Sequence, residues 1–128
     1  LLEELRALAP LPYYLPWPED VLMRRICESM LRAPAQRTTA QALARQHALT
    51  PKTLHRRFLK STGMSWGRWY QQMRLMASIP QLLQGMAITT VALESGYESH
   101  SAYTAAFRKQ FGRPPSEFAA AADRATPR

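Results

Sequence analysis

Apolar residues recur at spacings of three and four along most of the chain, in segments separated by prolines, glycines and helix-capping residues. Residues 19–31 carry Leu22, Ile26 and Met30 at intervals of four, which is typical of the buried face of an α-helix. A proline followed by two acids suits the N-terminus of this helix, and a further proline soon after it is expected to end it. The pattern therefore predicts a first helix over about residues 19–31.

The next two segments have the sequence pattern of a helix-turn-helix. Thr38 and Gln41 form a predicted capping box, which opens a short helix. A tight turn follows at residues 47–49, and Thr50 then caps a second helix that starts with proline and stops at Gly63. Two helices joined by a turn of three to four residues are the signature of this motif.

A longer helix is predicted over residues 66–84, capped by Ser65 and closed by Gly85. Its apolar positions lie three and four residues apart, so we assign the stripe to a hydrophobic core and not to a cofactor site. Pro80 lies near its C-terminal end, where it removes one backbone hydrogen bond and is expected to bend the last turn.

The second half of the chain repeats the helix-turn-helix pattern. Thr89 is predicted to cap a short helix, Gly96 turns the chain, and Ser99 caps a helix that stops at Gly112. Residues 50–63 and 99–112 therefore align at an offset of 49 residues. They agree at Thr50/Ser99, Leu54/Tyr103, Phe58/Phe107, Lys60/Lys109 and Gly63/Gly112.

The predicted fold is all-α, with about seven helices. A first helix-turn-helix subdomain spans residues 19–64, a linker helix spans 65–84, and a second subdomain spans 85–128. Residues 1–18 contain four prolines and are predicted to form a short helical stub and an extended linker.

The charge distribution indicates an anionic partner. The formal net charge is +8, and no carboxylate occurs between Glu28 and Glu94, a stretch that holds nine Lys and Arg residues. Such a one-signed surface favours nucleic acid first and an acidic membrane surface second, with a merely solvated basic face as the alternative. No apolar run approaches the roughly 20 residues of a membrane span. The single Cys27 fits a reducing compartment.

Catalytic and metal-binding patterns do not emerge from the sequence. His47, His55 and His100 have no ligand partner three or four residues away, and neither HExxH nor CxxC is present. The sequence also has no glycine-rich phosphate loop, and its carboxylates are too scattered to form a pair. We therefore expect no enzyme activity, no cofactor and no metal.

Three stretches resemble the DNA-binding domain of the AraC/XylS family of bacterial transcription regulators. They are LHRRFLKSTGMSW, RLMAS-x2-QLL and VALESGYESHSAYTAAFRKQFGRPPSEF, and the resemblance runs from about Glu19 to Phe118. It implies a monomeric domain that lays both second helices into successive major grooves of double-stranded DNA. The linker helix, about 28 Å long at 1.5 Å per residue, would be a spacer close to the roughly 34 Å between those grooves.

The resemblance also implies properties of a longer protein. Family members commonly carry an N-terminal sensing or dimerisation domain, and the Pro-rich start without Met fits its absence from this sequence. RNA polymerase is the implied partner of the DNA-bound protein, and the bacterial cytoplasm its implied location. A basic helical module that binds RNA or an acidic protein surface is the alternative from another class.

By position, the resemblance assigns two sets of residues to the interface. The implied base-reading residues are Lys52, His55, Arg56, His100, Ser101, Thr104 and Ala105. The implied backbone-binding residues are Thr38, Thr50, Arg57, Lys60, Arg68, Thr89, Ser99, Arg108 and Lys109. The first reading helix has the longer polar side chains, so we expect the first half-site to carry more of the sequence specificity. Ala48 stands where the first turn of the family usually has glycine.

Overall fold

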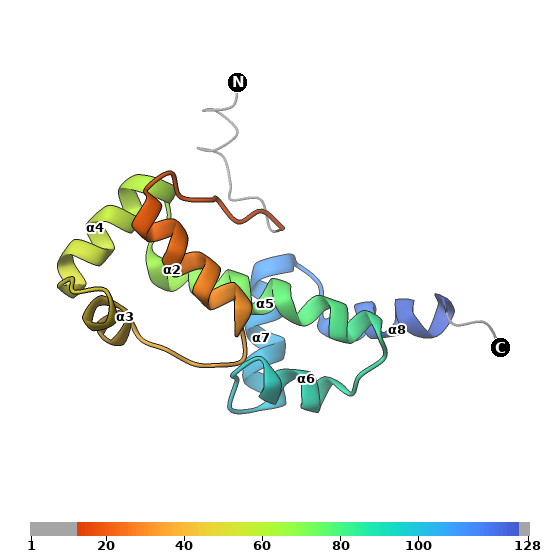
Figure 1. The fold of residues 1–128 in the computed structure, drawn as a ribbon. Helices are drawn as coiled ribbons and strands as arrows, with labels where there is room; N and C mark the ends of the chain where they lie inside the picture. The colour runs from red at the N-terminus through yellow and green to blue at the C-terminus, as the bar shows by residue number, and fades with distance from the viewer. Residues whose placement is uncertain (1–12, 126–128) are drawn as a thin grey trace, which may run out of the picture.

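One long helix runs through the middle of the molecule, and the other helices lie on either side of it (Figure 1). The computed structural model describes residues 13–125, which form seven helices and their connecting loops, without a strand. The helices are α2 (Val21–Arg32), α3 (Ala40–Gln46), α4 (Pro51–Thr62), α5 (Trp66–Leu83), α6 (Ile88–Glu94), α7 (His100–Phe111) and α8 (Pro115–Ala125). The all-α prediction is confirmed.

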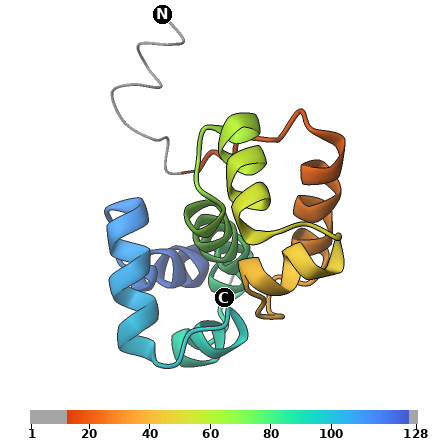
Figure 2. The same cartoon turned by 90° about the vertical axis from the view of Figure 1, so that its left-hand side faces the viewer.

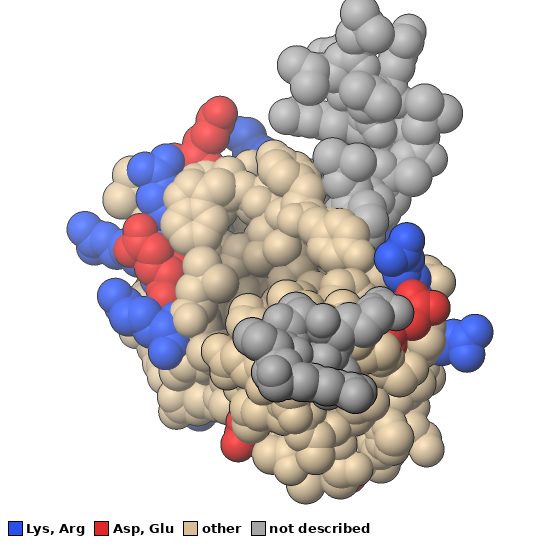
Figure 3. Space-filling view, turned by 90° about the vertical axis from the view of Figure 1, so that its right-hand side faces the viewer, with Lys and Arg blue, Asp and Glu red and all other residues tan. Residues whose placement is uncertain are grey.

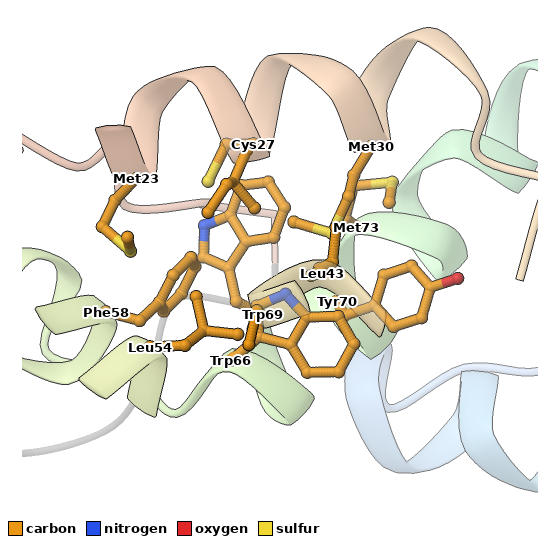
Figure 4. Close-up of a cluster of buried hydrophobic side chains, with 12 residues drawn as sticks. Met23, Cys27, Met30, Leu43, Leu54, Phe58, Trp66, Trp69, Tyr70 and Met73 are labelled. Atoms are coloured by element: carbon orange, nitrogen blue, oxygen red, sulfur yellow. The ribbon is translucent and has the colours of Figure 1, made fainter. Parts of the chain in front are cut away.

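Helix α5 contributes to two separate hydrophobic cores. The first core joins α2, α3 and α4 to the N-terminal half of α5, where Phe58 meets Trp69 edge to face with ring centroids 5.8 Å apart (Figure 4). The second core joins α6, α7 and α8 to the C-terminal half of α5 through Leu75 and Leu82. We call these two halves of the molecule the first unit and the second unit. The predicted linker helix is thus part of both units.

The first helices of the two helix-turn-helix motifs end with the same hydrogen bond. In the first, the amide of Leu49 donates to the carbonyl of Ala44 (2.7 Å), and in the second the amide of Tyr97 donates to the carbonyl of Ala92 (3.0 Å). Each six-residue closure is a Schellman motif, which requires a left-handed residue just after the helix. The offset here is 48 residues, so the second turn is one residue longer than the first, and the predicted offset of 49 holds only for α4 and α7.

Two of the predicted helix caps are wrong. Helix α3 is capped by Thr39, whose side chain accepts from the amide of Ala42 (3.0 Å), and not by Thr38. The amide of Thr38 instead donates to the hydroxyl of Tyr70 (3.1 Å), which holds this residue outside the helix. The predicted Thr38–Gln41 capping box therefore does not form.

The N-cap of helix α6 lies two residues before the predicted cap Thr89. Its N-cap is Ala87, without a side-chain hydrogen bond, and Thr89 is an exposed residue inside the helix. Met86 and Ile88 pack against the second core, so apolar burial sets this helix start in place of a capping hydroxyl. Helix α5 runs through Pro80 without interruption, and the amide of Gln84 donates to the Pro80 carbonyl (3.0 Å).

The end of the predicted N-terminal linker is packed against both units. The indole nitrogen of Trp69 donates to the carbonyl of Pro16 (2.8 Å), and Leu15 packs against the first core. Tyr13 stacks on Phe111 of the second unit, with ring centroids 4.9 Å apart. Residues 13–18 therefore form a strap across the domain, while the predicted helical stub lies in residues 1–12, outside the described residues.

Ala48 provides a test of backbone strain, because it has a φ of 56°, in the left-handed region. We expect Ala48→Gly to raise the free energy of unfolding by about 1 kcal/mol, since this conformation costs an L-residue roughly that much. Urea unfolding of both proteins measures the difference.

The matched control is Ala102→Gly, at an exposed position of α7. Glycine inside a regular helix is expected to lower stability by about 1 kcal/mol. If Ala48→Gly also destabilised the domain, the proposed strain at the turn would be absent.

Candidate nucleic-acid interface

Helices α4 and α7 are the second helices of the two motifs, and they run in the same direction when the molecule is seen from the side (Figure 2). Both begin with a serine or threonine cap: Thr50 accepts from the amide of Thr53 (3.1 Å), and Ser99 accepts from the amide of Ala102 (3.1 Å). Both end at a left-handed glycine, as predicted. The sequence repeat therefore gives two equivalent helices in space.

Core packing fixes which face of each helix points outward. Leu54 and Phe58 of α4 are fully buried, and so are the equivalent Tyr103 and Phe107 of α7. Residues on the opposite face are therefore turned to solvent. Lys52, His55 and Arg56 are exposed on α4, and His100, Ser101 and Ala105 are exposed on α7, whereas Thr104 is half-buried. The structure thus brings each predicted reading set onto one outer face.

The two outer faces occupy equivalent positions but differ in chemistry. The equivalent pairs are Lys52/Ser101, His55/Thr104 and Arg56/Ala105. On α4 these positions carry long cationic or imidazole side chains, and on α7 they carry hydroxyls and a methyl group. An open hollow of about 450 Å³ on α7 is lined by His100, Ser101, Thr104, Ala105 and Arg108. The predicted readers of the second helix therefore lie together on one open surface.

Two residues of α3 lie beside the outer face of α4 and are not among the predicted site residues, namely Gln41 and Arg45. A second open hollow, of about 490 Å³, lies at the start of α4 and is lined by Gln41, Arg45, Leu49, Thr50 and Pro51. The turn between α3 and α4 brings the outer face of α3 beside the N-terminus of α4. Arg45 could have been proposed as a site residue from the sequence, because it lies in the stretch without carboxylates.

The predicted backbone-binding cations fall into two groups. Lys60, Arg68, Arg108 and Lys109 are exposed, and no salt bridge involves them among the side chains of residues 13–121. The side of the molecule opposite the one in Figure 2 has uncharged atoms at its centre, with charged side chains toward its margins (Figure 3).

Arg57 differs from these cations because it already has a protein partner. Its Nε and Nη2 donate to the two carboxylate oxygens of Asp20, each at 2.8 Å. The equivalent residue in the second unit, Ala106, packs against the second core, so this helix position faces the body of the domain. The geometry thus gives Arg57 a structural contact within the domain.

Asp20 links helix α2 to helix α4. One of its carboxylate oxygens caps α2 by accepting from the amides of Leu22 (3.0 Å) and Met23 (3.3 Å). Its own amide donates to Ser61 of α4 (3.1 Å). The hydrogen bond from Arg57, with the backbone bonds, lowers the pKa of Asp20 below its ordinary value although partial burial opposes this. The same pair raises the pKa of Arg57.

Two helix-turn-helix motifs that share a helix and present equivalent exposed helices define a DNA-binding domain. Comparison with known families agrees, since a family model described as a helix-turn-helix domain matches residues 43–121. The chain belongs to the AraC-type helix-turn-helix family and is a DNA-binding domain of that family.

Individual relatives support the same assignment. Over 103 residues the chain is 32% identical to the HTH-type transcriptional regulator RipA of Corynebacterium glutamicum, a match that covers 80% of this chain and 31% of RipA. The chain therefore spans about a third of the length of that relative.

Solved structures share the fold. An AraC-type transcriptional regulator from Chromobacterium violaceum superposes with a TM-score of 0.74 at 19% identity, covering 82% of this chain and 95% of that one. The DNA-binding domain of AdpA, solved in complex with a target DNA, gives a TM-score of 0.69 at 26% identity, covering 80% of this chain and 93% of that one.

Within residues 13–125, none of the helices has the length and apolarity that crossing a bilayer requires.

The Asp20–Arg57 pair predicts a specific dependence of stability on pH. The folded-state pKa of Asp20 lies below its unfolded value, so the stabilisation is present above about pH 4 and is lost as the pH falls through the folded pKa. Asp20→Asn retains a good N-cap but removes the charge, and we expect it to cost about 1 kcal/mol at pH 7. Urea unfolding of both proteins between pH 7 and pH 3 measures this difference.

The stability gap between the two proteins should narrow below about pH 4, since protonated Asp20 no longer binds the guanidinium as a carboxylate. A gap that stayed constant down to pH 3 would show that the charge of Asp20 contributes nothing.

Proposed function

We propose that this domain recognises specific sequences in double-stranded DNA by placing the N-terminal turns of α4 and α7 in successive major grooves. The observation that carries this proposal is the equivalence of the two outer helix faces, at positions related by 49 residues. A general anion binder needs cations, but it does not need two equivalent helices with their outer residues in register. Two equivalent helices that run in the same direction suit a ligand that repeats itself every helical turn.

The chemistry of each outer face suggests its reading preference. Arg56 can donate two hydrogen bonds to O6 and N7 of one guanine, which discriminates against other bases by about 1–3 kcal/mol. His55 and Lys52 lie on the same face, and Arg45 of α3 lies at its start. On α7 the methyl group of Ala105 suits the C5-methyl of thymine, and the shorter side chains leave more of the recognition to DNA shape.

Contacts to the DNA backbone are assigned to exposed cations and to two helix N-termini. Helix N-termini favour anions, because their free amides and the helix dipole both point outward there. The proposed set of backbone contacts leaves out Arg57, Thr38 and Thr89, because Arg57 pairs with Asp20 and the two threonines are not helix caps. The proposed set is Thr50, Lys60, Arg68, Ser99, Arg108 and Lys109.

The role of the whole protein is part of the proposal. We propose that the domain belongs to a longer regulator of bacterial transcription that works in the cytoplasm, contacts RNA polymerase when bound to DNA, and dimerises through another domain. The isolated domain is proposed to be monomeric. Its role is binding and not catalysis, because the outer faces carry cations, imidazoles and hydroxyls suited to phosphates and base edges.

Selection of randomised duplex DNA by the domain at near-physiological salt, followed by sequencing, tests the proposal. Two enriched elements about 10 bp apart would support paired reading helices. A single element would leave α7 as a backbone-binding helix only. Tight, salt-sensitive binding without enrichment, or preferential capture of RNA in a competition, would favour the alternative of a basic module for other anions.

Arg56 and Lys60 form a matched pair of variants, since both are exposed cations of α4 with different proposed roles. Arg56→Ala is expected to cost about 1–3 kcal/mol on the selected sequence and to relax the preference at one base pair. Lys60→Ala should weaken binding to all sequences alike and lower the slope of log K against log salt by about one unit. Fluorescence anisotropy titrations at several salt concentrations measure both effects.

Equal losses for Arg56→Ala on selected and scrambled DNA would remove its reading role. A sequence-dependent effect of Lys60→Ala would likewise contradict its assignment to phosphate.

A further inference from the structure

Arg74 is a charged residue buried where the two units meet. It lies on α5 between Met73 of the first core and Leu75 of the second, and only 9% of its surface is exposed. Among the side chains of residues 13–121 it is the one buried charged residue. Burying an ionised group costs free energy unless the surroundings compensate for it, so the contacts of this side chain need an explanation.

The guanidinium lies between two aromatic rings that come from different units. Its central carbon is 4.8 Å from the ring centroid of Tyr70 and 5.0 Å from that of Tyr97. Tyr70 belongs to the first core, and Tyr97 lies in the turn of the second helix-turn-helix motif. Within the described residues no carboxylate pairs with Arg74, and its Nε has no hydrogen-bond partner. The two ring faces therefore supply the compensation, as cation–π contacts do.

Each ring is anchored in its own unit. The Tyr70 hydroxyl accepts from the amide of Thr38 (3.1 Å) and donates to the carbonyl of Gln36 (3.2 Å), so it holds the loop between α2 and α3. Tyr97 meets Tyr103 of α7 with ring centroids 5.5 Å apart. A continuous row of contacts thus leads from the first unit through Arg74 to the second reading helix.

The turn that carries Tyr97 has little room beside Arg74. Nη1 of Arg74 is 3.5 Å from the carbonyl oxygen of Gly96. A Cβ atom at Gly96 would lie 2.9 Å from the same nitrogen and 3.3 Å from Cγ of Arg37. The guanidinium is therefore packed against the turn itself as well as against the ring.

We infer that Arg74 is a positioning residue that fixes the second reading helix relative to the first. Its planar guanidinium fills the space between two flat rings, which a flexible ammonium or an apolar chain cannot do in the same way. By holding the turn before α7 against the first unit, it sets the separation of α4 and α7. This role for DNA binding rests on the proposed function, but the fixed separation is a property of the domain alone.

The separation is measured first without DNA, in the variant Lys60→Cys with Lys109→Cys. These exposed positions are equivalent in α4 and α7, and spin labels on them report the distance between the helices. Cys27 is fully buried, and burial raises the pKa of its thiol to about 12, so it stays unlabelled. Pulsed electron paramagnetic resonance measures the distance between the labels in the parent protein, Arg74→Met, Arg74→Lys and Arg25→Met. Arg25 is an exposed cation of α2, so Arg25→Met controls for the loss of one charge.

A single narrow distance distribution is expected for the parent protein and for Arg25→Met. A broader or shifted one is expected for Arg74→Met, with Arg74→Lys in between. An unchanged distribution in Arg74→Met would overturn the inference. If circular dichroism showed that Arg74→Met does not fold, Tyr97→Leu would replace it, because this variant removes one ring and leaves the charge. Tyr97→Leu is expected to broaden the distance distribution. An unchanged distribution in Tyr97→Leu would contradict the inference.

Binding to DNA provides a second readout that a merely structural role would not change. One base pair inserted between the two selected elements is expected to weaken the parent protein by about tenfold, because the duplex must deform to meet both helices. Arg74→Met should lose most of this discrimination, whereas Arg25→Met should keep it. Equal discrimination in all three proteins would overturn the positioning role, and absence of any specific binding by the parent would refute the proposed function while leaving the distance result intact.

Discussion

The burial of α5 in two cores is the constraint on which the rest of the structure depends. In its N-terminal half Trp69 packs edge to face with Phe58 of α4, and its C-terminal half packs in the second core with Tyr103 of α7. The hydroxyls of Ser78 and Tyr103 lie 2.7 Å apart in a buried hydrogen bond, and burial raises the pKa of Tyr103 to about 12. Helices α4 and α7 are therefore both packed against one continuous helix.

The shared helix also explains how a short chain builds two units. Helix α5 follows the first helix-turn-helix motif as α8 follows the second, and it precedes the second motif as α2 precedes the first. Each motif needs a helix before it and after it to bury its apolar face, because two short helices alone bury too little surface. One helix in both roles gives each motif its two neighbours.

The buried faces of α4 and α7 carry similar residues, whereas their exposed faces differ. Leu54 and Phe58 correspond to Tyr103 and Phe107, all fully buried, because packing against α5 demands an apolar residue at these positions. The outer positions meet no such demand, and there α4 has cations where α7 has small residues. A further asymmetry lies in the contacts to the preceding chain, since Asp20 pairs with Arg57 of α4 and Tyr13 stacks on Phe111 of α7.

The sequence by itself determined the features that depend on neighbouring residues. The caps at Thr50, Ser65 and Ser99 and the glycine that ends α4 or α7 were predictable, because each acts through hydrogen bonds or backbone angles within a few residues. The apolar spacing likewise predicted which faces of the helices are buried, and thereby the outward positions of the residues proposed to read DNA. The resemblance to a known family added their roles, which local physics alone does not provide.

The tertiary structure decided everything whose partner lies far away in the chain. Tyr70 holds Thr38 outside its predicted capping role across 32 residues, and Asp20 pairs with Arg57 across 37. The sandwich of Arg74 between two tyrosines was equally invisible, because helical spacing shows only that a residue is polar and not what closes over it. A sequence pattern reports the face that each helix must bury, whereas the partners of its polar groups depend on how the helices meet.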